Sequence, residues 1–483
     1  MTQRLFRLLS LALAAALVFS ACGPLTAVPD ASPTPGTAAA TGTAIAFPTA
    51  TPASSINVDP ASLAHVRIQV WHAFNGASAQ AFTSKLARFN STNEWGITVD
   101  ETPQGDYPSL FEAVTAALAS AAHPDLVAAL PEQALAWEAS GAVVDLTSYV
   151  GDPKFGLTGS DVADFPPVIW QQDEVNGRRL GVPAERSARF LFYNLTWAHE
   201  LGFDHPPATD EEFRQQACAA NASFRTDADQ TNDGYGGWIV DADWMTVYPW
   251  LLAFGGGVVV PVPARDVTAG GNYRFRSEQN LAALEFLKTL KDNACAWMTS
   301  GPENPLALNP GPFYEQFSRR SALFITGDLT EAAAFSAALT RLGSADEWTM
   351  IPFPGPQAQA VTVYGPSYIL LKSTPEKQLA AWLFVRWLLS PENQADWVEA
   401  AGTLPLRTAA LDLLTAYRSA HPQWNAAVKV LPLAQGVPQR ADWRTLRYVL
   451  ADGTLSIFRM DVPLAEIPGV LAEMDATAEE LSK

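Results

Sequence analysis

The sequence predicts an α/β protein whose first unit has a largely parallel sheet. Stretches with the alternating pattern of strands are followed by stretches with helical spacing, and this order repeats along the chain. Hydrophobic residues make up 48% of the chain and charged residues 17%, so most of it can bury a core. At 483 residues the chain is too long for one compact core and fits two or three domains.

The first α/β unit begins near residue 65. Residues 66–71 alternate between apolar and polar positions, which predicts a strand, and further strands are expected at 97–101 and 126–130. The intervening helices are indicated by two apolar stripes: Phe82, Leu86 and Phe89, then Leu110, Val114 and Leu118. Ligands of such sheets bind beyond the carboxyl ends of the strands, so the candidate ligand loops are 71–76, 103–107 and 131–133.

A second α/β unit is predicted after a strand at 189–194. Thr209 is placed to cap a helix over 210–222, with Glu212 at the capping-box distance. Another helix is expected at 277–292 and a strand at 322–327. The helices at 375–389 and 391–400 each start with Pro after Thr or Ser, a common N-terminal signal.

Composition excludes several classes of protein. The 31 Lys and Arg against 50 Asp and Glu give a net charge of −19, which argues against a binder of nucleic-acid backbone. Three Cys cannot build a disulfide scaffold or a Cys-based zinc site. No nucleophile elbow, Walker loop, dinucleotide fingerprint or HExxH motif is present, so no cofactor is expected. Asp and Glu are plentiful, which leaves a two-carboxylate glycosidase open.

The N-terminal segment indicates export. Residues 1–21 have the basic start and short apolar run of a signal peptide. Cys22 follows small residues at the cleavage edge, which resembles a bacterial lipobox and implies a lipid anchor; an ordinary secretory signal is the alternative. Residues 22–64, rich in Pro, Thr and Ala, are expected to form a disordered tether.

The order of short motifs along the folded part resembles extracellular solute-binding proteins of family 1, the receptors of bacterial ABC importers. The most similar members are the binders of sugars and of glycerol-3-phosphate. Each motif is weak alone, but the shared order behind a lipobox is specific. The motifs are WHAFNG (71–76), QGDY (104–107), NGRRLGVP (176–183), FYN (192–194), PAT (207–209), GPS (365–367), SPEN (390–393) and AGTLPLR (401–407).

The resemblance implies a two-lobe fold of the type II periplasmic-binding-protein class, with the ligand cleft between lobes joined by hinge strands. Lobe one would comprise residues 65–189 and 360–405. Lobe two would comprise 190–359 and 406–483. The implied function is a non-enzymatic, lipid-anchored monomer outside the cytoplasm, which captures a mono- or oligosaccharide and delivers it to membrane permease subunits. A binder of glycerol-3-phosphate or a glycerophosphodiester, a secreted glycan-active enzyme and a sensory receptor subunit remain alternatives.

Candidate ligand-binding residues are side chains that suit the hydroxyl edge or the apolar face of a sugar. Most have a competing structural role: His72 and Asp328 could cap helices, Asp106 could belong to an ordinary turn, Glu132 could complement a helix dipole, Arg186 could form an interlobe salt bridge, and Arg407 could be structural. Arg440 is a weaker candidate than these. The full set is His72, Phe74, Gln104, Gly105, Asp106, Glu132, Arg186, Trp244, Gly256, Asp328, Tyr364, Gly365 and Arg407.

Two further features have structural rather than ligand-binding interpretations. Residues 227–234 space oxygen ligands as calcium loops do, but Asn232 stands where Gly is needed and Trp238 where Glu is needed. A solvated Asp-rich turn without metal is therefore favoured. Cys218 and Cys295 are expected to form a disulfide outside the cytosol, with two buried thiols as the alternative.

Overall fold

The computed structural model describes residues 54–483, except residues 121, 261–272, 299–312, 460 and 483. The expected signal peptide, Cys22 and the tether up to residue 53 lie outside the described residues. The expected disorder of residues 54–64 is wrong, because Ser54 and Ser55 donate hydrogen bonds to Asp152 Oδ2 and Leu63 is buried. Within the described part of the chain, no helix combines the length and the apolar character needed to cross a membrane.

A five-stranded sheet forms the centre of lobe one. Its strand order is β2-β1-β3-β14-β6, and β1 (Arg67–His72) pairs in parallel with β2 (Thr98–Pro103) and β3 (Leu126–Ala129). The fourth strand, β14 (Ser367–Leu370), pairs antiparallel with β3 on one side and with β6 (Val182–Pro183) on the other. A helix follows each parallel strand, as the sequence predicts. The lobe's main helices are α2 (Gly76–Thr92), α3 (Tyr107–Ala117), α4 (Pro131–Glu138), α14 (Pro375–Leu388) and α15 (Pro391–Ala401).

An eight-stranded sheet forms the centre of lobe two. Its strands are β7 (Ser187–Asn194), β8 (Trp238–Val240), β9 (Ala296–Met298), β10 (Phe324–Asp328), β11 (Trp348–Ile351), β12 (Phe353–Pro354), β13 (Gln359–Tyr364) and β15 (Ala434–Gly436). This sheet is mixed, because β7 pairs antiparallel with three neighbours, whereas β8 pairs in parallel with β9 and β10. The long strand β7 enters lobe two from lobe one, and its neighbours β10, β11 and β13 run in the opposite direction.

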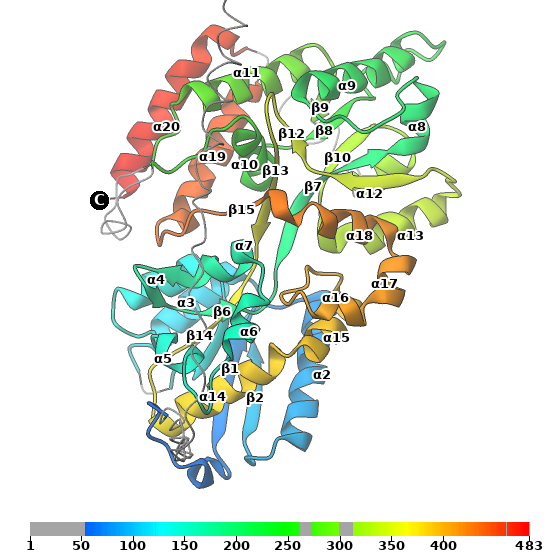
Figure 1. Cartoon of the computed structure of the whole chain (residues 1–483). Helices are drawn as coiled ribbons and strands as arrows, with labels where there is room; N and C mark the ends of the chain where they lie inside the picture. Colours follow the sequence, from blue (N-terminus) through cyan, green and yellow to red (C-terminus); the bar gives the residue numbers. More distant parts are fainter. Residues whose placement is uncertain (1–53, 121, 261–272, 299–312, 460, 483) are drawn as a thin grey trace, which may run out of the picture. The chain divides into compact units, whose positions relative to one another are not determined.

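Helices cover the sheet of lobe two. The helices α19 and α20 contact each other, and both contact α11. Figure 1 shows these three together at one side of the lobe. The helices are α8 (Leu195–Glu200), α9 (Asp210–Arg225), α10 (Trp244–Ala253), α11 (Glu278–Asp292), α12 (Phe313–Ser318), α13 (Ala332–Leu342), α18 (Pro422–Lys429), α19 (Trp443–Phe458) and α20 (Ile467–Leu481).

The chain crosses between the lobes at β7 and again after β13, two strands that run between them in Figure 1. Because β13 pairs with β7 and β15, residues 360–364 belong to the lobe-two sheet. The second crossing therefore lies at Gly365–Pro366, a few residues later than expected. A third connection runs after α15 through α16 (Ala410–Leu413) and α17 (Thr415–Ala420).

Short elements complete the fold. They are η1 (Pro60–Leu63), α5 (Thr147–Val150), α6 (Gly159–Ala163), α7 (Pro167–Trp170), η2 (Gln171–Asp173), β4 (Glu174–Val175), β5 (Arg178–Arg179), η3 (Leu329–Glu331), η4 (Leu431–Leu433) and η5 (Leu464–Glu466).

Capping residues in the sequence determine where the main helices begin. Thr209, Ser277, Thr374 and Ser390 each accept a hydrogen bond from a backbone N–H in the first turn of the following helix. The Pro residues after Thr374 and Ser390 occupy the first turn, where no intrahelical partner for their nitrogen is needed. Cys218 on α9 is bonded to Cys295, next to β9, and this disulfide ties a helix to an edge strand of lobe two.

Candidate functional site

A cavity of about 360 Å³, here called the inner pocket, lies between the lobes. Lobe one contributes the start of α3, the start of α4 and Gln172. Lobe two contributes α10, the end of β13 and one face of α19. The lining includes Tyr107, Glu132 and Gln172 from lobe one, and Asp243, Trp244, Tyr364, Gly365, Trp443, Arg447 and Tyr448 from lobe two and the crossing.

Aromatic rings form the lobe-two wall of the inner pocket. Trp244 begins α10, where the Asp243 carboxylate caps the helix by accepting from the Met245 N–H. The Trp244 ring meets Trp443 edge-on at 5.5 Å between centroids and lies 6.5 Å from Tyr364. Rigid rings fixed in this way offer apolar faces at low entropic cost.

A salt bridge crosses the pocket between the lobes. Arg447 on α19 donates from Nη1 to Glu132 Oε1 on α4 at 3.1 Å. Glu132 is buried, and this burial raises the pKa of its carboxyl, partly offset by the Arg447 charge. The Arg447 guanidinium also lies 5.7 Å from the Trp244 ring centroid and 5.5 Å from that of Tyr448. The pair links helices of both lobes at the wall of the cavity.

Three polar atoms of pocket-lining side chains are buried without a hydrogen-bond partner among the described residues. They are Trp443 Nε1, Arg447 Nε and Gln172 Oε1. A buried polar atom without a partner costs about 1–3 kcal/mol. A ligand with hydroxyl groups can supply partners for these two donors and this acceptor.

Asp328 forms a hydrogen-bonded centre beside the pocket, at the end of β10. Its carboxylate accepts from the Ser187 hydroxyl at 2.6 Å, from the Tyr364 hydroxyl and from the Thr330 N–H at 2.8 Å. Burial raises the pKa of Tyr364 well above its ordinary value, and the Asp328 charge adds to this. Asp328 thus caps η3, as the structural alternative expected, and also fixes the Tyr364 side chain that lines the pocket.

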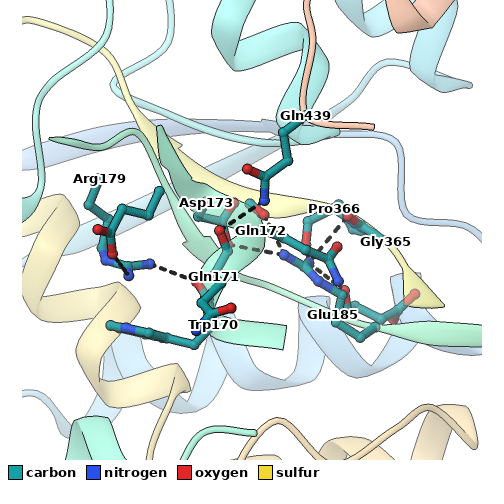
Figure 2. Close-up of polar contacts among 12 residues, drawn as sticks. Trp170, Gln171, Gln172, Asp173, Arg179, Glu185, Gly365, Pro366 and Gln439 are labelled. Carbon is teal, nitrogen blue, oxygen red and sulfur yellow. Dashed lines mark hydrogen bonds and ion pairs between the residues drawn. The ribbon is translucent and has the colours of Figure 1, made fainter. Parts of the chain in front are cut away.

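Arg186 does not line the inner pocket, because its guanidinium is fully buried within lobe one and the crossing. Nη1 donates to the carbonyl oxygens of Glu185, Gly365 and Pro366, and Nη2 donates to Asp173 Oδ2 at 3.0 Å. Figure 2 shows these partners gathered around one point. The partner carboxylate is in lobe one, so the expected interlobe salt bridge is not formed. Arg186 instead holds the crossing segment against its own lobe.

The other expected arginine, Arg407, is also engaged inside the protein. It donates to Asp164 Oδ2 at 2.6 Å and to Asp161 Oδ1 at 2.8 Å, and its guanidinium lies over the Phe165 ring. These contacts fix the third connection between the lobes to α6. The structural interpretation of Arg407 accounts for all of them.

His72 and Phe74 are buried at the carboxyl end of β1. The Phe74 N–H donates to His72 Nδ1 at 3.2 Å, and His72 Nε2 lies 3.2 Å from Glu101 Oε2. Burial lowers the pKa of His72, although Glu101 opposes this. The Phe74 ring packs on Phe82 and Trp397. Neither side chain lines the inner pocket.

The loop after β2 and the glycine after α10 also contribute less than expected. Asp106 is exposed and caps α3 by accepting from the Ser109 N–H at 2.8 Å. Gln104 and Gly105 precede it outside the pocket, and the following Tyr107 is the residue that lines it. Gly256 packs against Asn280 on α11, away from the pocket.

The inner pocket thus brings together four of the expected residues: Glu132, Trp244, Tyr364 and Gly365. The sequence analysis missed Tyr107, Gln172, Asp243, Trp443, Arg447 and Tyr448. A signal was present for α19: Trp443, Arg447 and Ala451 recur every four residues, so they share one helix face. Only the contact of that face with α4 identifies it as part of the cleft.

The Asp-rich turn has no metal-binding geometry in the structure. Asp227 and Asp229 accept hydrogen bonds from backbone N–H groups two residues further on. Across the described residues, no group of three or more His, Cys, Asp or Glu side chains could hold a metal ion.

Comparison with known proteins gives the context of this cleft. Residues 77–432 match the family model described as bacterial extracellular solute-binding protein. The sn-glycerol-3-phosphate-binding periplasmic protein UgpB of Yersinia pestis is 23% identical over 368 residues, which cover 73% of this chain and 76% of the relative. The corresponding protein of Salmonella typhimurium is 22% identical over 372 residues, covering 73% and 77%.

Solved structures have the same fold. The sugar-binding protein MalE from Xanthomonas citri superposes with a TM-score of 0.71 at 19% identity, covering 86% of this chain and 97% of that one. UgpB from Mycobacterium tuberculosis in complex with glycerophosphocholine gives 0.67 at 20% identity, covering 86% and 98%. The cyclic alpha-maltosyl-1,6-maltose binding protein from Arthrobacter globiformis gives 0.69 at 16% identity, covering 86% and 99%. The family match spans well over half of the chain, and the chain therefore belongs to the bacterial extracellular solute-binding proteins.

Proposed function

We propose that this chain is the receptor of an ABC importer and that it captures a carbohydrate in the inner pocket by closure of its two lobes. The observation that carries the proposal is the pocket itself. Its lobe-two wall is aromatic, with Trp244, Tyr364 and Trp443, and its opposite wall carries Glu132. Apolar rings suit the C–H face of a sugar, and the carboxylate, amide and guanidinium groups suit its hydroxyls.

Charge favours a neutral ligand. The inner pocket contains one guanidinium, Arg447, and two carboxylates, Glu132 and Asp243. Arg447 already donates to Glu132, so its charge is balanced within the pocket. A doubly charged phosphate would meet a surplus of negative charge, whereas sugar hydroxyls can both donate to the carboxylates and accept from Arg447 Nε.

Glycerol-3-phosphate or a glycerophosphodiester is the second candidate. Arg447 favours it, because a guanidinium with an unpaired Nε is suited to a phosphate oxygen. The named relatives that bind sn-glycerol-3-phosphate add support. In this case Glu132 would have to release Arg447 or bind a proton when the ligand enters.

When the two lobes close on a ligand, they form the closed shape that the permease recognises. Closure excludes water from the pocket and strengthens each hydrogen bond to the ligand. The ligand shifts the population towards the closed form, in which Glu132 and Arg447 meet. Within this scheme the lobes are bounded near the expected residues, 65–189 with 360–405 and 190–359 with 406–483, apart from β13.

The remaining parts of the scheme concern location. A signal peptide over 1–21, lipid on Cys22 and a tether from Cys22 to residue 53 would hold the receptor at the outer side of the membrane, beside permease subunits. The folded part works as a monomer and binds without catalysis. No nucleic acid or cofactor takes part.

The test is calorimetry and thermal shift on the full chain in detergent micelles. The ligands are mono-, di- and oligosaccharides, glycerol-3-phosphate and glycerophosphocholine. A bound ligand raises the melting temperature by mass action. Binding of a saccharide supports the first candidate, and binding restricted to the phosphate esters supports the second. No shift with any of them, or turnover of a glycan, would overturn the proposal.

A further inference from the structure

A second cavity between the lobes, of about 460 Å³ and here called the outer pocket, adjoins the same elements as the inner pocket. Lobe one contributes Leu135 and Glu138 of α4, its C-cap Ala139 and the β4–β5 hairpin. Lobe two contributes residues 440–442, which immediately precede Trp443. The inner pocket uses the first turn of α4, at Glu132, and the outer pocket uses its end, about 9 Å further along the helix axis.

The hairpin presents a fixed polar wall to the outer pocket. Its turn is Asn176-Gly177, and both residues have positive φ, 54° and 73°. Asn-Gly is the preferred sequence for such a two-residue turn. Asn176 lines the pocket, and its side-chain amide can both donate and accept.

Charged groups on both sides are held in place by partners. Arg178 donates from Nε to Asp145 Oδ2 at 3.1 Å and is ion-paired with Glu138. In lobe two, Arg440 donates to both oxygens of Asp442 at 3.1 and 3.0 Å. Three carboxylates thus surround two guanidinium groups, so the local charge is negative. An anionic occupant is disfavoured, and a neutral hydroxylated one is suited to this set.

The outer pocket also has an unmet acceptor and an apolar surface. Glu138 Oε2 is buried without a hydrogen-bond partner among the residues that the structure describes. A hydroxyl donor that displaces the wall would relieve that cost. Leu135, Ala139, Val175 and Leu180 supply apolar contacts on the lobe-one side.

We propose that the outer pocket is a second subsite, which binds further sugar units of an oligosaccharide whose end occupies the inner pocket. This proposal rests on the carbohydrate function proposed above. The preferred ligand is then a neutral oligosaccharide rather than a monosaccharide. The residues that contact these further sugar units are Asn176, Glu138 and residues 440–442.

Affinity as a function of ligand length tests this subsite. The full chain in detergent micelles is titrated with malto-, cello-, xylo- and manno-oligosaccharides of one to six units. In the series that binds, Kd is expected to fall at least tenfold between one and three units. Ala139→Trp places a large ring in the outer pocket from the exposed C-cap position of α4 and should abolish this gain while leaving the monosaccharide Kd within about twofold.

Two controls keep the result interpretable. Ala116→Trp makes the same change on exposed α3, away from both pockets, and should keep the length dependence. Asn176→Gly keeps a turn with positive φ and removes the amide, so it should lower only the oligosaccharide affinity. Equal Kd at every length, or an equal loss for monosaccharide and oligosaccharide in Ala139→Trp, would overturn the subsite alone. No binding of any saccharide would overturn the carbohydrate function and the subsite together.

Discussion

Two buried arginine–carboxylate pairs lie in different regions of this molecule. Arg186 and Asp173 both belong to lobe one and the crossing, and the two terminal nitrogens of Arg186 are occupied by carbonyl, hydroxyl and carboxylate oxygens. Arg447 and Glu132 belong to different lobes, and a hydrogen bond from Arg447 Nη1 to Glu132 Oε1 joins them. The first pair is part of a lobe's interior. The second can separate when the lobes move, without unfolding either lobe.

The comparison shows what distinguishes a structural arginine from a ligand-binding one. Both arginines are charged residues with a buried acidic partner, so burial alone does not separate them. What differs is the number of internal partners and whether those partners belong to the same lobe. Both terminal nitrogens of Arg186 are bonded within lobe one and the crossing, although its Nε is buried without a partner among the described residues. Arg447 instead bonds to the other lobe and faces a cavity with aromatic walls.

The largest effect is expected from Arg186→Ala. Removing the guanidinium leaves Asp173 buried without its counter-charge and frees three backbone carbonyls at the crossing. A loss of about 3–5 kcal/mol in the free energy of unfolding is expected. Urea titration followed by circular dichroism measures it. A loss below about 1 kcal/mol would mean that the Arg186 cluster does not hold the crossing.

Trp443→Ala is expected to have the next largest effect, on ligand affinity. The ring stands edge-on to Trp244 in the inner pocket and is fully buried. Removing a central aromatic contact should cost about 2 kcal/mol, some thirtyfold in Kd. Calorimetry with the ligand identified by the screen measures this. Trp387→Ala, which removes a partly buried ring on α14 of lobe one, is the matched control and should leave Kd unchanged. Equal ligand affinity in Trp443→Ala and the wild type would mean that α19 does not contribute to the binding site.

Arg447→Met should give a smaller, pH-dependent effect. Burial already raises the pKa of Glu132, and loss of the Arg447 charge raises it further. A carboxyl with a raised folded pKa contributes its stability below the unfolded pKa, and this contribution is lost as pH rises through the folded pKa. The variant should therefore match the wild type near pH 4 and fall below it towards pH 7 in melting temperature. Glu132→Gln combined with Arg447→Met should remove this pH dependence. If the single variant keeps the wild-type pH profile, the pair does not form in solution.

The smallest effect is expected from Asp106→Ala. The side chain is exposed and caps α3, so its loss should cost about 1 kcal/mol of stability. Ligand affinity should stay within about twofold, because Asp106 does not line the inner pocket. Thermal unfolding and calorimetry measure the two quantities. A loss of ligand affinity of more than tenfold would mean that the loop after β2 contacts the ligand.

The fold followed from local signals, but only part of the site did. Alternation and capping residues located β1, β3, α9 and α11, because strand and helix periodicity and N-terminal caps act over a few residues. Glu132 was found because it follows β3 at the carboxyl edge of a parallel sheet. Arg447 lies 315 residues further along the chain, and no periodicity brings α19 against α4. The antiparallel pairing of β7 was missed for the same reason, since it depends on how the chain crosses between the lobes.

The distance between the lobes tests the central claim most directly. Spin labels at Ala116 on α3 and Leu455 on α19, both exposed positions in different lobes, report the opening of the cleft by electron–electron double resonance. With saturating ligand, the distance distribution is expected to narrow and shift to shorter values, and Trp443→Ala should require a higher ligand concentration for the same shift. An identical distribution with and without a ligand that calorimetry shows to be bound would contradict capture by lobe closure.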